Sequence, residues 1–123
     1  MFRPAIESLT SPYEKLKRAA VGLPDIVEST SYGTPALKAG KKLLCRIKDS
    51  DTVVVMCPLE EKEMLMEAAP DLYFETDHYR GWPAMLVRIQ AIPLDELRVC
   101  LERAWLMQAT RTMVKARDAA RVQ

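Results

Sequence analysis

The pattern of apolar and polar positions predicts a helix near the N-terminus. Ser11 can cap this helix, Pro12 suits its first turn, and Glu14 completes a capping box. Residues 22–24, Gly-Leu-Pro, end it, because glycine and proline disfavour its continuation. The apolar residues within residues 2–9 follow neither a helical nor a strand spacing clearly, and we interpret this segment as a first turn or a docked arm.

After this helix the pattern changes to that of extended strands. Residues 26–32 are rich in β-branched side chains, and residues 42–48 alternate between two faces. Between them lie a break at residues 33–35 and a short extended piece at residues 36–38. Residues 52–56, Thr-Val-Val-Val-Met, are the most strand-like segment of the chain. Together these segments predict an antiparallel meander.

The second half of the chain adds two helices and two strands. The spacing of apolar residues predicts helices over residues 58–69 and 94–109. Between the helices, residues 72–75 and 84–89 have strand character and flank a loop at residues 77–83. Two further strands are therefore expected after the meander.

The order helix, several strands, helix, two strands, helix predicts an α+β fold. The economical packing is a two-layer sandwich, in which a largely antiparallel sheet carries helices on one face. Neither a repeat nor a linker interrupts residues 1–110, so we predict a single domain there. Residues 111–123 are basic and weakly apolar, and we interpret them as a C-terminal extension that is either helical or frayed.

Composition narrows the class of protein. A chain of 123 residues can bury a core without disulfides or metals. Hydrophobic residues make up 49% and charged residues 28%, which is typical of a globular domain. The chain has no apolar run of roughly 18 residues and no secretory signal at its N-terminus, so we expect a cytoplasmic protein without a membrane segment.

Few residues suit catalysis or metal binding. The three cysteines, Cys45, Cys57 and Cys100, lack a C-x-x-C pair and lie in apolar stretches, so we interpret them as small buried hydrophobes. His78 is the single histidine, which excludes a three-histidine zinc site. We predict no catalytic residue, no metal, no cofactor and no enzymatic activity. A Cys–His pair assembled by the fold stays open as an alternative.

The net charge of +1 conceals an uneven distribution. Residues 31–48 carry five bases and no acid, whereas residues 49–77 carry nine acids and one base. We interpret the acidic segment as a solvated helix surface. A basic hairpin can neutralise phosphates whatever the net charge, so we consider weak, phosphate-directed DNA binding by Lys38, Lys41, Lys42, Arg46, Arg80 and Arg88. The alternative is a solvated hairpin whose lysines protect an edge strand from aggregation.

A second unusual segment is the loop at residues 78–83, His-Tyr-Arg-Gly-Trp-Pro. It gathers a titratable ring, two aromatic rings and a guanidinium, and loops with such side chains are often functional. If it meets the segment around Tyr32 in space, the two form a small-molecule or anion site lined by Tyr32, His78, Tyr79 and Trp82. The alternative is a structural loop whose aromatic rings cap the edge of the sheet.

Three segments stand out by their order and spacing. They are residues 23–42, which contain Ser31-Tyr32-Gly33-Thr34-Pro35-Ala36-Leu37-Lys38, then residues 78–83, and then residues 94–105. Together they resemble the MmcQ/YjbR family of small bacterial proteins over roughly residues 12–110. The basic tail past Ala109, and Ala84 after Trp82-Pro83, depart from the family pattern.

The resemblance implies an α-β(3)-α-β(2)-α fold, like that of type III secretion chaperones. It also implies DNA binding through a double wing of β-strands, and it brings no catalytic residues. We therefore place a non-enzymatic DNA-binding protein first among the hypotheses. The second is small-molecule or anion binding at Tyr32 and the loop at residues 78–82. The third is a protein-interaction adaptor or homodimer that uses these loops, the exposed side of the sheet and an apolar surface at Trp105. We expect a monomer or a weak homodimer.

Overall fold

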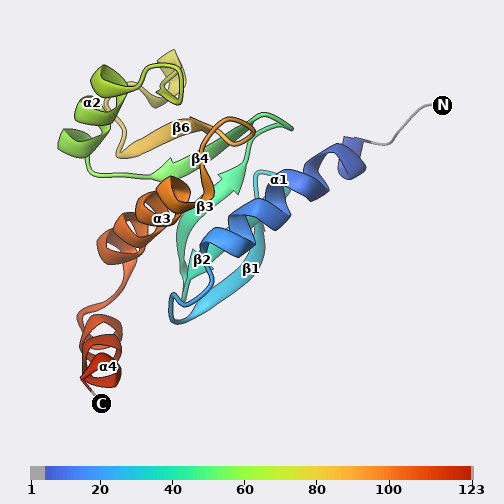
Figure 1. The fold of residues 1–123 in the computed structure, drawn as a ribbon. Coiled ribbons are helices and arrows are strands. Elements are labelled where there is room, and N and C mark those ends of the chain that lie inside the picture. Colours follow the sequence, from blue (N-terminus) through green and yellow to red (C-terminus); the bar gives the residue numbers. More distant parts are fainter. Residues whose placement is uncertain (1–4, 123) are drawn as a thin grey trace.

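The computed structural model describes residues 5–122 and arranges them as a curved sheet with helices packed on one side (Figure 1). In chain order the elements are α1 (Ala5–Ala19), β1 (Ile26–Ser31), β2 (Thr34–Ala39), β3 (Lys42–Ile47), β4 (Thr52–Met56), α2 (Leu59–Ala68), β5 (Tyr73–Phe74), the 3₁₀ turn η1 (Asp77–Tyr79), β6 (Ala84–Arg88), α3 (Leu94–Gln108) and α4 (Arg111–Arg121).

Within the described residues the sheet has six antiparallel strands in the order β1-β2-β3-β4-β6-β5. β1 to β4 form the predicted meander, and β6 lies between β4 and β5, so that β5 is an edge strand. The α+β fold with a largely antiparallel sheet is confirmed. The first run has four strands instead of three, because the break at Gly33 belongs to a two-residue turn that joins β1 to β2.

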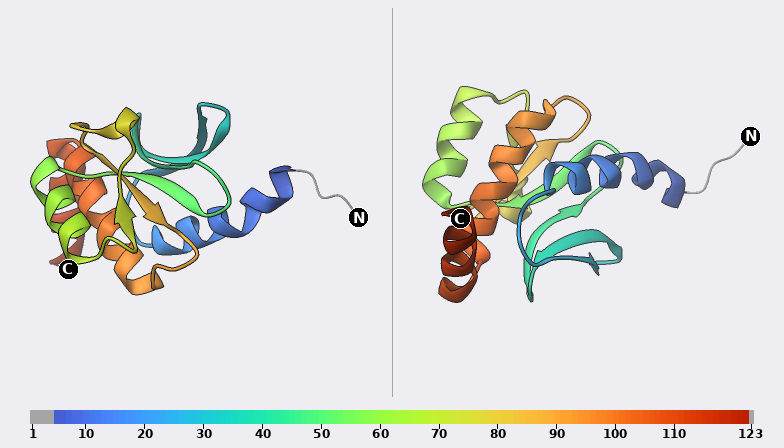
Figure 2. Two further views of the ribbon diagram at one scale, coloured as in Figure 1. Left: turned by 90° about the horizontal axis from the view of Figure 1, so that it is seen from above. Right: turned by 60° about the horizontal axis from the view of Figure 1, so that its bottom comes forward.

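The helices α1 and α3 pack against one face of the sheet, as Figure 2 shows. Alternate positions of the strands supply the core on this face, because successive side chains of a strand point to opposite sides. Cys45 and Ile47 of β3 and Val53 and Val55 of β4 are buried there with Leu101 of α3. α2 packs against β5 and β6, at the edge of the sheet remote from β1.

A loop, and not a helix, partly covers the opposite face of the sheet. Val54, Ala84 and Leu86 are buried on this face and form a second, smaller cluster. Phe74 and Tyr79 pack against them from β5 and from the loop that joins β5 to β6. Beyond this cluster, over β3 and β2, the face carries the polar and aromatic side chains of the site described below.

Trp105 of α3 is fully buried, so the hypothesis that it supplies an exposed apolar surface is wrong. Its indole Nε1 donates to the carbonyl oxygen of Pro24 at 2.8 Å. The C-terminal extension forms α4, and the guanidinium of Arg117 lies 4.7 Å from the centre of the indole ring. Thr110 caps α4 by accepting a hydrogen bond from the N–H of Met113. The last helix therefore contributes to the cover of the tryptophan.

The first helix begins earlier than its capping signals predict. α1 starts at Ala5 and includes Pro12, so Ser11 is not its N-cap. A cap contributes only about 1 kcal/mol, and tertiary packing commonly overrides such local preferences. Here α1 packs on the sheet through Leu16 and Ala19, which are buried. In the described part of the chain, none of the helices has both the length and the apolar character needed to cross a membrane.

Candidate ligand pocket

Two segments that are remote in the sequence meet on the side of the sheet opposite α1 and α3 (Figure 2). One is the β1–β2 turn and the other is the loop between β5 and β6. Between them lies a cavity of about 570 Å³, a volume typical of small-molecule sites. All four residues predicted for a ligand site line it. The full lining is Tyr32, Thr34, Leu43, Arg46, Lys48, Val54, Met56, His78, Tyr79, Trp82 and Ala84.

The β1–β2 turn places Tyr32 at one wall of the cavity. Ser31 pairs with Thr34, so Tyr32 and Gly33 are the two central residues of the turn. Both have left-handed backbones, with φ of 52° and 78°, as a type I′ hairpin turn requires. Asparagine and glycine are preferred there, because a left-handed backbone costs other residues about 1–2 kcal/mol. Tyr32 adopts this conformation although it is 87% exposed and contributes little to the core.

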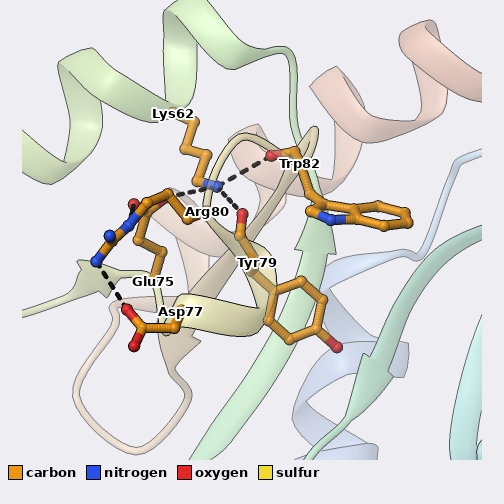
Figure 3. Close-up of polar contacts among 6 residues, drawn as sticks. All are labelled: Lys62, Glu75, Asp77, Tyr79, Arg80 and Trp82. Carbon is orange, nitrogen blue, oxygen red and sulfur yellow. Dashed lines mark hydrogen bonds and ion pairs between the residues drawn. The ribbon is translucent and has the colours of Figure 1, made fainter.

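Lys62 holds the opposite wall of the cavity in place (Figure 3). It lies on α2 with only 1% of its side chain exposed. Its Nζ donates to the carbonyl oxygens of Tyr79 and Trp82 at 2.7 and 2.9 Å, and it pairs with Oε1 of Glu75 at 2.7 Å. Three acceptors thus match the three N–H donors of the ammonium group. The loop at residues 75–83 is therefore tied to α2 at both of its ends.

Lys62 is not among the site residues that the sequence predicts. The sequence predicts a solvated acidic surface for residues 49–77, and a lysine on such a surface is expected to be exposed and not part of a site. The signal that could have identified it is its isolation, because Lys62 is the only base among nine acids in that segment. A single buried cation can anchor a neighbouring carboxylate and carbonyl groups, but the sequence does not indicate which side of the helix is covered.

Arg46 joins the two walls across the floor of the cavity. Its Nη2 donates to the phenol oxygen of Tyr79 at 2.7 Å, and its guanidinium lies 5.1 Å from the centre of the Tyr32 ring. His78 packs edge-on against Tyr79, with ring centres 4.8 Å apart. Neither aspartate nor glutamate is among the lining residues, whereas Arg46 and Lys48 are both cations. The cavity therefore favours a ligand that carries negative charge.

The other five residues predicted to bind nucleic acid do not line the cavity. Arg80 pairs with Asp77 at 2.7 Å, and Arg88 pairs with Asp51 at 3.0 Å. The other three are Lys38, Lys41 and Lys42, which lie at or near the β2–β3 turn. This turn is at the opposite end of β2 from Tyr32. The six basic residues are thus divided among separate places, and DNA binding stays a prediction.

The three cysteines are buried, as predicted. Burial raises the pKa of the Cys45 thiol to about 12 and that of Cys57 to about 11, and it also raises the pKa of Cys100. None of the three lines the cavity beside His78, so the Cys–His pair that the sequence left open does not form there. Among residues 5–122, no cluster of three or more histidine, cysteine, aspartate or glutamate side chains could hold a metal ion.

The burial of the cysteines predicts that their thiols are unreactive in the folded protein. At pH 8, a thiol with a pKa near 11 is ionised to only about one part in a thousand, and the thiolate is the reactive form. We expect Ellman's reagent to modify none of the three cysteines rapidly in the native protein, and all three in concentrated urea. Rapid release of one equivalent of the chromophore from the native protein would contradict this assignment.

The sequence and the fold of this chain both resemble those of known proteins. The sequence pattern of the YjbR family matches residues 21–107. Uncharacterized proteins of Mycobacterium tuberculosis and Mycobacterium bovis are 42% identical over 55 residues, which is 45% of this chain and 43% of theirs. The match thus spans less than half the length of these relatives.

A solved structure supports the fold. The crystal structure of Deinococcus radiodurans protein DR2400, from the domain family DUF419, superposes with a TM-score of 0.69. The superposition covers 86% of this chain and 87% of that one, at 17% sequence identity. At this level of identity the likeness concerns the path of the chain, and the chemistry of the cavity has to be argued from the residues that line it.

Proposed function

This chain belongs to the YjbR family, and we propose that it is a non-enzymatic module that binds a small organic anion in the cavity between Tyr32 and Trp82. The observation that carries the proposal is the composition of the lining. Two remote segments and the strands between them contribute aromatic rings, apolar side chains and two cations, without a carboxylate. Pockets of this kind bind a ligand through an apolar body and orient it by a few polar groups.

Arg46 is the group that would recognise the negative charge. Among the described residues its guanidinium donates to the neutral phenol of Tyr79 and to the carbonyl oxygen of Ile47, so no carboxylate compensates its charge. An arginine can donate two parallel hydrogen bonds to a carboxylate or a phosphate. Lys48 adds a second positive charge at the same cavity.

The same residues support the non-enzymatic part of the proposal. A nucleophile needs an activating base close to it. The buried cysteines have raised pKa values and do not line the cavity. The His78 ring packs against the ring of Tyr79, and not beside a cysteine nucleophile. The cavity therefore favours binding over chemistry.

Duplex DNA is the competing partner. A duplex requires cations spread along a track that follows its phosphates. Two of the six basic residues, Arg80 and Arg88, already have carboxylate partners, and the lysines at the β2–β3 turn lie a strand's length from Arg46. This distribution favours one compact anionic group at Arg46 over a phosphate track.

An NMR titration separates these two functions. We expect 1-naphthoate, added to the ¹⁵N-labelled protein up to about 1 mM, to shift the amide resonances of residues 32–34, 46–48 and 78–84 in a saturable manner. Resonances at the β2–β3 turn, around Lys41, should not move. Absence of saturable shifts around the cavity would contradict the proposal.

A parallel titration with a short DNA duplex at about 50 mM salt tests the competing function. DNA binding predicts shifts centred on the β2–β3 turn, and an affinity that falls with salt with a slope near −4 to −5 if about five phosphates are neutralised. Such a result, combined with no effect of 1-naphthoate, would replace the proposed function with DNA binding.

A further inference from the structure

The conformation of Tyr32 is not explained by the stability of the turn. Its φ of 52° lies in the left-handed region, which favours glycine and asparagine at this position of a type I′ turn. Burial does not compensate, because Tyr32 is 87% exposed. Its ring lies 5.1 Å from the Arg46 guanidinium, and exposed cation–π contacts of this kind are weak. Local strain at an exposed aromatic residue is a reason to look for a functional role.

Trp82 presents a second exposed aromatic ring on the opposite wall of the cavity. It is 59% exposed, although its backbone carbonyl is held by the buried ammonium of Lys62 at 2.9 Å. Figure 3 shows the indole ring directed away from this anchor, on the same side of the loop as the ring of Tyr79. The main chain at Trp82 is therefore fixed while the ring is left accessible. A preorganised exposed ring of this kind loses little entropy when a ligand stacks on it.

The floor between the two rings combines apolar surface with the uncompensated guanidinium of Arg46. β3 and β4 separate the β1–β2 turn from the loop that carries Trp82. They contribute Arg46 and Val54 to the cavity, and Ala84 of β6 adds a small side chain. A flat ring can thus lie over small side chains with aromatic faces at its two ends, while an anionic substituent reaches the guanidinium.

We propose that the ligand is a flat aromatic anion, which stacks against Tyr32 and Trp82 and places a carboxylate or phosphate on Arg46. This inference rests on the proposed function and specifies its ligand class. Aromatic side chains that flank a cavity recognise the faces of planar rings, and a saturated ring of equal size offers no such face. The strained backbone of Tyr32 is retained because the ring is needed at this wall of the cavity.

Three matched probes test the ligand class by isothermal titration calorimetry on the full chain. They are 1-naphthoate, its saturated analogue decahydro-1-naphthoate, and the uncharged 1-naphthamide. We expect 1-naphthoate to bind at least tenfold more tightly than either of the others. Equal affinity for the saturated analogue would overturn the aromatic proposal and leave anion binding intact. Failure of both carboxylates to bind would overturn the proposed function as well.

The variant Tyr32→Asn tests the role of the turn. Asparagine suits the left-handed position, so we expect the Tm to rise by about 4 °C, while the affinity for 1-naphthoate falls at least tenfold. Tyr32→Phe, which keeps the ring, is the matched control and should bind as the native protein does. A Tyr32→Asn variant that retains full affinity would overturn the role of the ring.

Trp82 provides an independent check at the other wall. Trp82→Ser should lower the affinity for 1-naphthoate at least tenfold, with little effect on the affinity for decahydro-1-naphthoate. Because the ring is largely exposed, the Tm should change by less than about 3 °C. Equal losses for the two carboxylates would mean that Trp82 only shapes the cavity, and would contradict stacking.

Discussion

The variant Lys62→Met should lower the free energy of unfolding by about 3 kcal/mol, the largest effect on stability that we expect from a single substitution near the cavity. Methionine fills a similar volume but cannot donate. It leaves two carbonyl oxygens and the carboxylate of Glu75, whose side chain is 25% exposed, without their shared donor. Removal of one member of a buried ion pair is costly, because the other charge stays in a poorly solvated place. Urea denaturation followed by circular dichroism measures the loss.

A matched control is Lys41→Met, which removes an exposed lysine and should change the stability by less than about 0.5 kcal/mol. Glu75→Gln keeps an acceptor for Lys62 and removes only the charge, so we expect an intermediate loss. If Lys62→Met matched Lys41→Met in stability, the ammonium would not be the anchor of the loop. The milder Glu75→Gln variant keeps this comparison informative if Lys62→Met folds poorly.

The same variants distinguish support of the loop from general stability. Lys62 contacts the carbonyl groups of Tyr79 and Trp82, so its loss should broaden or shift the amide resonances of residues 76–83 more than those of β1–β3. The affinity for 1-naphthoate should fall with it. Uniform changes throughout the protein would indicate that Lys62 supports the fold as a whole and has no particular role at this wall.

The variant Arg46→Gln should lower the affinity for 1-naphthoate by about 30- to 100-fold. Hydrogen bonds to charged groups contribute about 1.5–3 kcal/mol, and replacement of the guanidinium removes both the charge and the paired donors. Glutamine is neutral and keeps a polar donor at this position, so the substitution chiefly removes the charge. Isothermal titration calorimetry measures the affinity, and urea denaturation should show a change in stability below about 1 kcal/mol.

Two further measurements show whether Arg46 acts through its charge. Lys42→Gln, at the far hairpin turn, should leave the affinity unchanged, while Lys48→Gln should cause a smaller loss than Arg46→Gln. The affinity for the uncharged 1-naphthamide should be the same in Arg46→Gln as in the native protein. A parallel loss for the amide would mean that Arg46 shapes the cavity and does not bind the anion.

Helices and strands were predicted well wherever the apolar residues kept one spacing, helical or extended, over the whole segment. The strand predicted at residues 52–56 has those bounds, and the helix predicted at residues 94–109 is α3, Leu94–Gln108. Errors occurred where local signals conflicted with packing. Pro35 suggested a break, but it lies within β2, and the capping signals at Ser11 suggested a start inside α1. Propensities of this kind are worth about 1 kcal/mol or less, and burial against the sheet outweighs them.

The candidate site was predicted in part. Its aromatic members stood out in the sequence because rings and a guanidinium gathered in one loop, and Tyr32 was linked to them only by hypothesis. The structure places Tyr32 and Trp82 at the same cavity. Arg46 was predicted to contact DNA, which stays a prediction, and it lies at the floor of this cavity. Its position follows from the pairing of β3 with β4, which no local pattern specifies.

By itself, the sequence determined the fold class, the bounds of the most periodic elements and the burial of the cysteines. These depend on residue spacing and on local hydrophobicity, which a linear pattern records. Only the tertiary structure decided that Lys62 is a buried anchor within an acidic segment, that Trp105 is covered by α4, and that two remote loops share a cavity. Each of these depends on which surfaces come into contact. The order of the strands and the docking of the helices decide those contacts, and both follow from the packing of the whole chain.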